Sequence, residues 1–275
     1  MNAVSCRLAE ADGKGEAHAR AHTRSAICSI LWRCGADSRG RGARKQYLSQ
    51  GEVGSGIPVF ADIPPADCLK IVSTARESEF SRHGTIFMEG DPIRHVTLLT
   101  SGSAKVTKLG QNATRVILRL AGPGDVVEVT GLPAEGRHCS MAQALNASAA
   151  MIWEASAFRA LVDRVPALRR NITKFAGQRL QELEARYREI STETVGKRLS
   201  HQLLRLFNQL GRRVNGNITL EINLSRAELA QMAGTTLWTV SRLLSEWKER
   251  GVLTAGREGI SVHNIQALRE FAQNE

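Results

Sequence analysis

The spacing of apolar residues changes several times along the 275-residue chain, and each change predicts a different kind of element. The segment IPPADCLKIVSTARESEF opens with prolines and continues at helical spacing, which predicts a helix. Later runs alternate apolar and polar residues between glycines, which is typical of half-buried strands. In one of them, Val116, Leu118 and Leu120 should share one face, opposite Arg115 and Arg119. The runs are GTIFMEG, HVTLLTSGSAKVTKLG, TRVILRLAGPGDVVEV and SMAQALNASAAMIWEA.

Short strands at such regular spacing predict a small antiparallel roll or barrel. The LGQNAT segment between two of the runs has the composition of a hairpin turn. We therefore predict that residues 53–165 form an antiparallel β-roll of the double-stranded jelly-roll type. With the helical segments that follow, the predicted fold class is α+β.

Pro166 opens a long helical stretch, predicted to span residues 166–192. Its apolar residues recur at alternating spacings of four and three, with Glu, Arg and Gln on the flanks, as in one strand of a coiled coil. This seam has two possible partners, the roll of the same chain and a second copy of the helix. A helix of about 40 Å overhangs a small roll, which favours a homodimer. The predicted interface residues are Ala176, Leu180, Leu183, Tyr187 and Ile190, and Thr194 continues the spacing.

Residues 193–275 predict a winged helix-turn-helix. Ser225 with Glu228 three residues later forms a capping box for a short helix, RAELAQMA. Gly234 suits the left-handed conformation of a sharp turn, and Thr236 caps a second helix that runs to Gly251. Two short helices joined in this way are typical of DNA-binding proteins. Before them lie an amphipathic helix, VGKRLSHQLLRLFNQLG, and a strand pair or extended run, NITLEINL; after them, VLTAGREGISVHN predicts a wing.

Charge and cysteine content narrow the classes of function. Lys and Arg number 37 against 27 Asp and Glu, and the pI is about 9.9, which favours a polyanionic partner such as nucleic acid or an acidic membrane surface. No apolar run approaches the roughly 18 residues of a membrane span, and ICSILW is too short for a signal-peptide core. Five cysteines without a C-x-x-C pair argue against a disulfide framework or zinc finger. We therefore expect a cytoplasmic protein without a membrane partner.

The first 52 residues are rich in Arg, Ala, Gly and Ser and lack sustained periodicity, which predicts a disordered basic arm. The alternative is that the native protein starts further in. Because the next methionine, Met88, lies in a strand-like run, such a start would use a non-Met codon, for example at Val53 or Val59.

The segment SRAELAQMAGTTLWTVSRLLSEWKERGVL, preceded by a roll and a long helix, resembles the Crp–Fnr regulators. The resemblance covers about residues 60–275. It implies a homodimer that binds a two-fold symmetric operator in double-stranded DNA and senses a signal in its roll. RNA polymerase is the further partner that an activating regulator would contact.

In a helix-turn-helix the second helix enters the major groove, where an exposed arginine can pair with guanine. Matched to the family motif, Arg242 is the guanine reader, while Arg226 and Thr239 contact the DNA backbone. Trp238 stands where the family usually has a glutamate, and Leu237 where the cyclic-AMP branch has an arginine, so the operator should differ from the familiar ones. Both side chains could instead form a buried helix–helix contact. The predicted DNA-binding residues are Ser225, Arg226, Thr236, Leu237, Trp238, Thr239, Ser241, Arg242 and Arg257.

The family's cyclic-AMP binders hold the nucleotide with a glycine–glutamate pair and an arginine–serine pair. Here the glutamate position is Val129 and the arginine position is Cys139, whereas Ser140 is kept. Arg137 is the nearest substitute for the missing arginine. The resemblance therefore implies an effector other than cyclic AMP bound in the usual way. The predicted effector-pocket residues are Val129, Arg137, His138, Cys139 and Ser140.

The resemblance raises two iron cofactors, an iron–sulfur cluster and haem, and the sequence leaves the cofactor unknown. Cys28 and Cys34 resemble part of the iron–sulfur motif of the Fnr branch, but Ser25 and Met151 replace the other two cysteines, and a four-iron cluster normally takes four. His138 and Cys139 together could ligate haem. The simpler interpretation of this pair is a surface histidine beside a small buried cysteine.

Three classes of function remain distinct. The first is a ligand- or redox-gated transcription factor. The second is a regulatory module of an enzyme, but no Gly-rich phosphate loop, H-E-x-x-H or G-x-S-x-G motif is present, and we expect no enzyme activity. The third is a non-specific architectural DNA binder, which would bind DNA equally well without Arg242 or Trp238.

Overall fold

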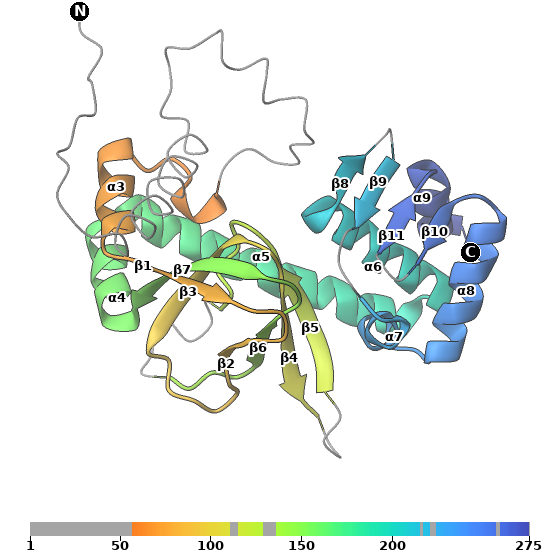
Figure 1. The fold of residues 1–275 in the computed structure, drawn as a ribbon, viewed down its shortest axis with the longest axis horizontal. Coiled ribbons are helices and arrows are strands. Elements are labelled where there is room, and N and C mark those ends of the chain that lie inside the picture. The colour runs from red at the N-terminus through yellow and green to blue at the C-terminus, as the bar shows by residue number, and fades with distance from the viewer. Residues whose placement is uncertain are drawn as a thin grey trace, which may run out of the picture.

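A computed structural model describes residues 57–110, 115–128, 136–214, 217–220, 224–256 and 259–274. These residues form two lobes beside one long helix, α5 (Pro166–Thr192) (Figure 1). The N-terminal lobe is a β-roll and the C-terminal lobe is a winged helix, so the predicted α+β architecture is confirmed. The predicted basic arm lies outside the described residues. Within them, no helix is long and apolar enough to cross a membrane.

The chain enters the roll through a 3-10 turn, η1 (Pro58–Phe60), and a helix, α3 (Pro65–Ser73). The helix predicted from the IPPADC segment therefore ends early, and its second half was predicted wrongly. Residues Arg76–Phe80 form strand β1, which pairs antiparallel with β7 (Ser148–Glu154). Pairing with a strand some 70 residues away decides this conformation, because backbone groups of a sheet need partners whatever the local spacing.

Within the described residues, seven strands form the roll as two antiparallel sheets, in the orders β1-β7-β3 and β2-β6-β4-β5. Between them lies a core that includes Leu99, Ala104 and Ala142. The hairpin predicted around LGQNAT is confirmed by the pairing of the strands on either side of it. The remaining strands are β2 (Thr85–Phe87), β3 (His95–Ser101), β4 (Ala104–Leu109), β5 (Arg115–Ala121) and β6 (Met141–Ala144).

Strand β5 does not keep the simple alternation expected of it. Val106 pairs with Arg119 whereas Thr107 pairs with Ile117, so Leu118 is an extra residue in a β-bulge. As a result Ile117 and Leu120 are buried, whereas Val116 is exposed and Leu118 only half-buried. Of the three residues predicted to share the buried face, Leu120 is buried as expected, but Val116 is not.

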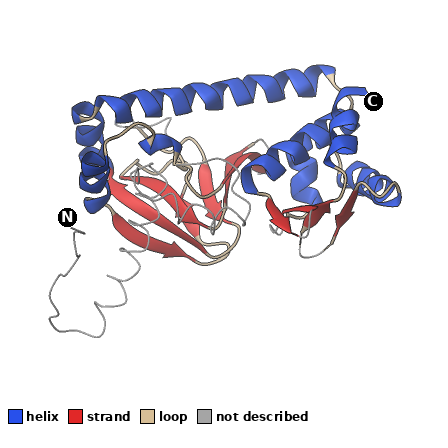
Figure 2. Cartoon of the chain, turned by 90° about the horizontal axis from the view of Figure 1, so that it is seen from above, coloured by secondary structure: helices blue, strands red, loops and turns tan. Residues whose placement is uncertain are grey.

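Helix α4 (Ala155–Arg164) leads to α5, whose N-terminal half packs on the roll. Phe175 and Leu168 are buried there, and the Asn171 side chain donates to the carbonyls of Val59 and Ala61 at 3.1 and 2.6 Å. Helix α5 begins and ends where the sequence predicted. Figure 2 shows it along one side of the molecule, with the roll and the C-terminal lobe both on its other side.

The C-terminal lobe is a winged helix-turn-helix, as predicted. Its sheet has the order β10-β11-β9-β8, and its core contains Trp247, Leu203 and Phe207. The strand pair expected within NITLEINL is instead formed by β8 and β9. The elements are α6 (Val195–Leu210), β8 (Arg212–Val214), β9 (Asn217–Leu220), α7 (Arg226–Ala233), α8 (Leu237–Glu249), β10 (Leu253–Ala255), β11 (Ile260–Val262) and α9 (Ile265–Asn274).

Candidate nucleic-acid interface and roll pocket

The turn between α7 and α8 is built from the residues that the sequence singled out. Ser225 Oγ accepts from the backbone N–H of Glu228 at 3.1 Å, and Glu228 Oε2 accepts from that of Ser225 at 2.9 Å, which completes the capping box. Gly234 adopts the left-handed conformation with φ 61°. Thr236 Oγ1 then accepts from the N–H of Thr239 at 3.2 Å and starts α8. The position of α8 is therefore set by three local devices.

Helix α8 has one buried face and one face open to solvent. Val240, Leu244 and Trp247 pack into the domain core. On the open face the Trp238 residue is 81% exposed and the Arg242 side chain 71% exposed. Because residues four apart share a helix face, Trp238 and Arg242 lie next to each other.

Leu237 is also exposed, at the first position of α8. The alternative that Leu237 and Trp238 form a buried helix–helix contact is therefore wrong.

The polar residues predicted to contact DNA gather around the start of the two helices. The Arg226 guanidinium of α7 donates to Ser241 Oγ of α8 at 3.4 Å, which brings these two side chains together. Arg242 is held loosely: its Nη1 lies 3.9 Å from Glu246 Oε2, whereas Arg250 reaches the other oxygen of that carboxylate at 3.1 Å. Arg257 lies outside the described residues.

Comparison with known proteins agrees with this architecture in both lobes. The Crp-like helix-turn-helix domain family matches residues 197–271, and the cyclic nucleotide-binding domain family matches residues 77–165. The chain belongs to the Crp–Fnr family. As a Crp–Fnr protein it is a DNA-binding transcriptional regulator with a cyclic-nucleotide-binding-like domain.

Curated relatives in the family are regulators of transcription rather than enzymes. The cyclic AMP receptor protein of Thermus thermophilus is 26% identical over 217 residues, which cover 79% of this chain and 97% of the relative. The CRP-like cAMP-activated global transcriptional regulator of Mycobacterium tuberculosis is 21% identical over 215 residues, covering 78% and 96%. The solved structure of FixK2 from Bradyrhizobium japonicum, 24% identical, covers 73% of this chain and 98% of its own with a TM-score of 0.65, and shows the shared fold.

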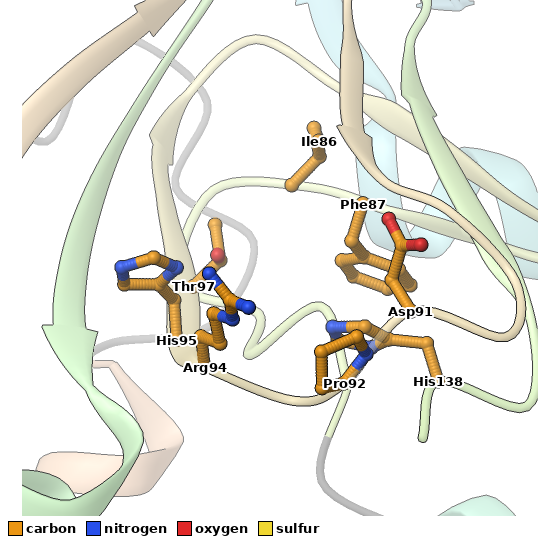
Figure 3. Close-up of a pocket in the computed structure, with 8 residues that line it drawn as sticks. All are labelled: Ile86, Phe87, Asp91, Pro92, Arg94, His95, Thr97 and His138. Carbon is orange, nitrogen blue, oxygen red and sulfur yellow. The ribbon is translucent and has the colours of Figure 1, made fainter.

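A pocket of about 390 Å³ opens in the roll between the β2–β3 loop and the segment at residue 138 (Figure 3). Arg94, His95 and Thr97 lie on one side of it, and Phe87 and His138 on the other. Its volume is at the small end of the range for small-molecule sites. The full lining is Ile86, Phe87, Asp91, Pro92, Arg94, His95, Thr97 and His138.

Among the predicted effector-pocket residues that the structure describes, His138 alone lines this pocket. Arg137 is exposed and donates to the carbonyl of Gly90 at 2.7 Å, so its guanidinium holds the β2–β3 loop. Ser140 is buried and Cys139 is exposed. Val129 lies outside the described residues.

A buried carboxylate joins the histidine and the cysteine that were considered as haem ligands. Glu128 forms a short contact with His138 Nδ1 and accepts from the Cys139 thiol at 3.3 Å. The His138 ring also stacks on Phe87, with 4.0 Å between centroids. His138 is thus buried and Cys139 exposed, the reverse of the simpler interpretation of this pair. Both side chains are engaged with one carboxylate, and we assign them no metal.

Sequence reasoning missed Arg119, which was expected on the outer face of β5. Its guanidinium donates to the carbonyl of Val126 at 3.2 Å and also to that of Val127. Burial and the neighbouring Arg179 lower the pKa of Arg119 to about 10, so it stays charged at neutral pH. Arg179 of α5 in turn binds Asp125 at 3.0 Å. Two arginines therefore fix the segment that leads to Glu128, where the family places its nucleotide anchors.

A second missed feature is the contact between the roll and the helix-turn-helix. Lys105 Nζ of β4 lies 2.8 Å from Glu228 Oε1, the same carboxylate that closes the capping box. Burial acts to raise the pKa of Glu228, but the hydrogen bonds from Lys105 and Ser225 and the Lys105 charge outweigh it and lower that pKa. Arg186 of α5 donates to the Leu118 carbonyl of β5 and, at 3.3 Å, to the Met232 carbonyl of α7. Charged side chains thus join the roll to α7 directly, through Lys105, and by way of α5, through Arg186.

The junction between α5 and α6 is held by two further arginines. Arg198 donates to the carbonyls of Ile190 and Glu193, both at 3.2 Å, and to those of Ala233 and Gly234 at 3.0 and 3.1 Å. It therefore caps the C-terminal ends of α5 and α7 together, where a cation is favoured. Arg205 pairs with Glu189 through two hydrogen bonds of 2.7 Å, a geometry typical of strong ion pairs.

The predicted dimer seam is open to solvent along the C-terminal half of α5. Leu180 and Leu183 are each 57% exposed, Tyr187 is 74% exposed, and Ile190 is exposed as well. Ala176 differs from them, because it is partly buried against the roll of its own chain. The seam available to a partner within the described residues therefore begins at Leu180.

Proposed function

We propose that this regulator binds a two-fold symmetric operator as a homodimer and that an effector in the roll controls this binding. The observation that carries the proposal is the open face of α8, where Trp238 and Arg242 stand side by side on a helix capped and oriented by α7. Such a helix fits the major groove, where its N-terminal residues reach base edges.

The dimer follows from the exposed seam of α5. Four large apolar side chains in one stripe, from Leu180 to Ile190, exceed what a monomer usually leaves in water. Their spacing matches a coiled-coil interface, in which a second α5 covers the stripe. A two-fold axis along α5 would place both copies of α8 toward the same DNA, with half-sites about one helical turn apart.

The roles of individual residues at the operator divide into two kinds. Arg242 reads guanine, because a guanidinium pairs with its O6 and N7 atoms and nothing in the described residues holds this side chain closely. Arg226, Ser225 and Thr239, at or near the starts of α7 and α8, contact phosphates. Phosphate contacts fix the register of the protein, and base contacts select the sequence.

We propose that the effector acts from the roll through the contacts that Lys105 and Arg186 make with α7. Lys105 and Arg186 connect the strands of the roll to α7, so a change in the roll shifts the helix-turn-helix. The effector is not cyclic AMP held in the usual way, because Val129 and Cys139 replace two anchoring side chains. RNA polymerase remains a proposed further partner.

The architectural alternative has support only from the net charge of +10. A binder of that kind attracts DNA through its positive charge alone. It would not need the exposed side chains of Trp238 and Arg242 to read bases.

Selection of duplexes from a random DNA pool by the purified protein, with and without cell extract, tests the proposal. We expect a two-fold symmetric sequence with a guanine in each half-site, enriched more strongly in one of the two conditions. Recovery of DNA without any sequence preference in both conditions would favour the architectural binder.

A further inference from the structure

The N-terminal turn of α8 exposes an apolar pair that the protein's own core does not use. Trp238 is 81% exposed and Leu237 is exposed beside it, whereas Trp247 at the other end of the same helix is buried. Burying an aromatic side chain is worth more than burying almost any other, so leaving one in water calls for a partner. The pair is continuous with Arg242, which indicates that one partner covers all three side chains.

The geometry of α8 sets how far Trp238 lies from the base that Arg242 reads. Trp238 is the second residue of α8, and Arg242 follows it by four positions. A helix rises 1.5 Å per residue, which places the two Cα atoms about 6 Å apart along the axis. Stacked base pairs are about 3.4 Å apart. Trp238 therefore reaches base pairs within about two steps of the guanine.

The chemistry of the indole limits what it can read in the major groove. Tryptophan has one N–H donor and no acceptor, so it cannot bind the amino groups of cytosine or adenine. The thymine C5-methyl group is the one apolar feature that the major groove displays, and apolar side chains recognise it. We propose that Trp238, supported by Leu237, selects thymine within two base pairs of the guanine read by Arg242. This inference rests on the proposed function, because it requires α8 to lie in the major groove.

The test replaces thymine by deoxyuracil, which removes only the methyl group. Each thymine of the selected operator is changed in turn, in both half-sites, and dissociation constants are measured for wild type and for Trp238→Ala. Burial of one methyl group contributes about fourfold in affinity, or about 15-fold for two half-sites. We expect that loss for the wild type at one thymine position near the guanine. Trp238→Ala should bind the thymine and uracil operators equally well at that position.

Two matched variants separate the indole's possible contacts. Trp238→Phe keeps an aromatic face but loses the N–H donor, and should still prefer thymine over uracil. If wild type binds the thymine and uracil operators equally well and Trp238→Phe binds both more weakly, the contact belongs to the N–H donor, and the proposed methyl contact is overturned. Arg242→Ala should weaken binding while keeping the methyl effect, because a different side chain makes that contact.

Failure of this inference differs from failure of the proposed function. If the protein selects an operator and Arg242→Ala impairs it, yet every thymine tolerates uracil, α8 reads DNA and Trp238 does not read thymine. If no operator is selected, both fail together. Unchanged operator affinity in Trp238→Ala would also overturn the inference and point to a protein partner for the exposed pair.

Discussion

Charged side chains inside the roll mainly serve the backbone and side chains of their own chain. Arg119 binds two carbonyls near Glu128, and Glu128 in turn binds His138 and Cys139. The phosphate of a cyclic nucleotide would need a positively charged side chain that is not already bound in these contacts. Desolvating an anion without a charged partner is costly. Arg137, the substitute suggested by the sequence, points instead to the Gly90 carbonyl.

We predict that cyclic AMP and cyclic GMP give no saturable heat at micromolar concentrations in calorimetric titration. Two hydrogen bonds to charged groups, each worth about 1.5 to 3 kcal/mol, are missing at Val129 and Cys139, which weakens binding by roughly two to four powers of ten. Arg137→Ala serves as the control and should behave as wild type. Micromolar binding that Arg137→Ala abolishes would show that the anchor had moved along the strand.

At the scale of elements, the helices were predictable and the contacts between distant strands were not. Helices α5 and α7 begin and end as predicted, because Pro166 and the Ser225–Glu228 capping box are local signals. Helix α6 ends one residue before the predicted Gly211, and Thr194 caps it instead of continuing the seam of α5. Strand β1 and the bulge at Leu118 depend on pairing partners far along the chain, which local spacing does not reveal. The same limit hid the ion pair between Lys105 and Glu228, whose residues are 123 positions apart.

Whether a charged residue faces in or out was the least predictable property of the site. Arg119 was placed outside by alternation, but the bulge turned it toward the segment before Glu128. The exposure of Trp238 was also open, because a tryptophan in a helix-turn-helix suits a core position equally well. The contact between Arg226 and Ser241 brings two predicted DNA-binding residues together, and their roles at DNA stay predictions.

The Lys105–Glu228 contact predicts a pH dependence of stability. Because the pKa of Glu228 is lowered on folding, its ionised form stabilises the protein fully above its ordinary pKa of about 4.3. That contribution is lost as pH falls through the lower folded-state pKa. Glu228→Gln keeps a capping-box acceptor and removes the charge. Wild type should exceed Glu228→Gln in free energy of unfolding at pH 7, and the difference should shrink below about pH 4.3.

Chemical denaturation at a series of pH values measures this difference, and comparing two variants cancels the general effect of acid. A difference that stays constant from neutral to acidic pH would contradict the assignment of the ion pair to Glu228.

At the scale of the whole molecule, α5 connects the roll, the helix-turn-helix and the proposed dimer seam. Its N-terminal half packs on the roll, its Arg186 reaches α7, and its exposed stripe is open to a second copy. Arg198 of α6 joins the end of α5 to α7. A change in the roll could then reach both DNA-binding lobes through one element.

We predict that Leu180→Glu combined with Leu183→Glu gives a monomer that binds operator weakly, because like charges would face each other across the seam. Light scattering at micromolar concentration measures the mass. Leu109→Glu is the control. It makes the same change at an exposed leucine at the end of β4, away from the seam, and should leave the dimer intact. A monomeric wild type would contradict the dimer.

The central claim is that α8 reads base sequence through Arg242. The most direct measurement compares dissociation constants for the selected operator and a random duplex of equal length, at one salt concentration, in wild type, Arg242→Ala and Arg226→Ala. We predict that Arg242→Ala costs about 1 to 3 kcal/mol per half-site on the operator and little on the random duplex. Arg226→Ala should weaken binding to both duplexes alike and reduce the salt dependence. Equal losses on both duplexes for Arg242→Ala would contradict the claim.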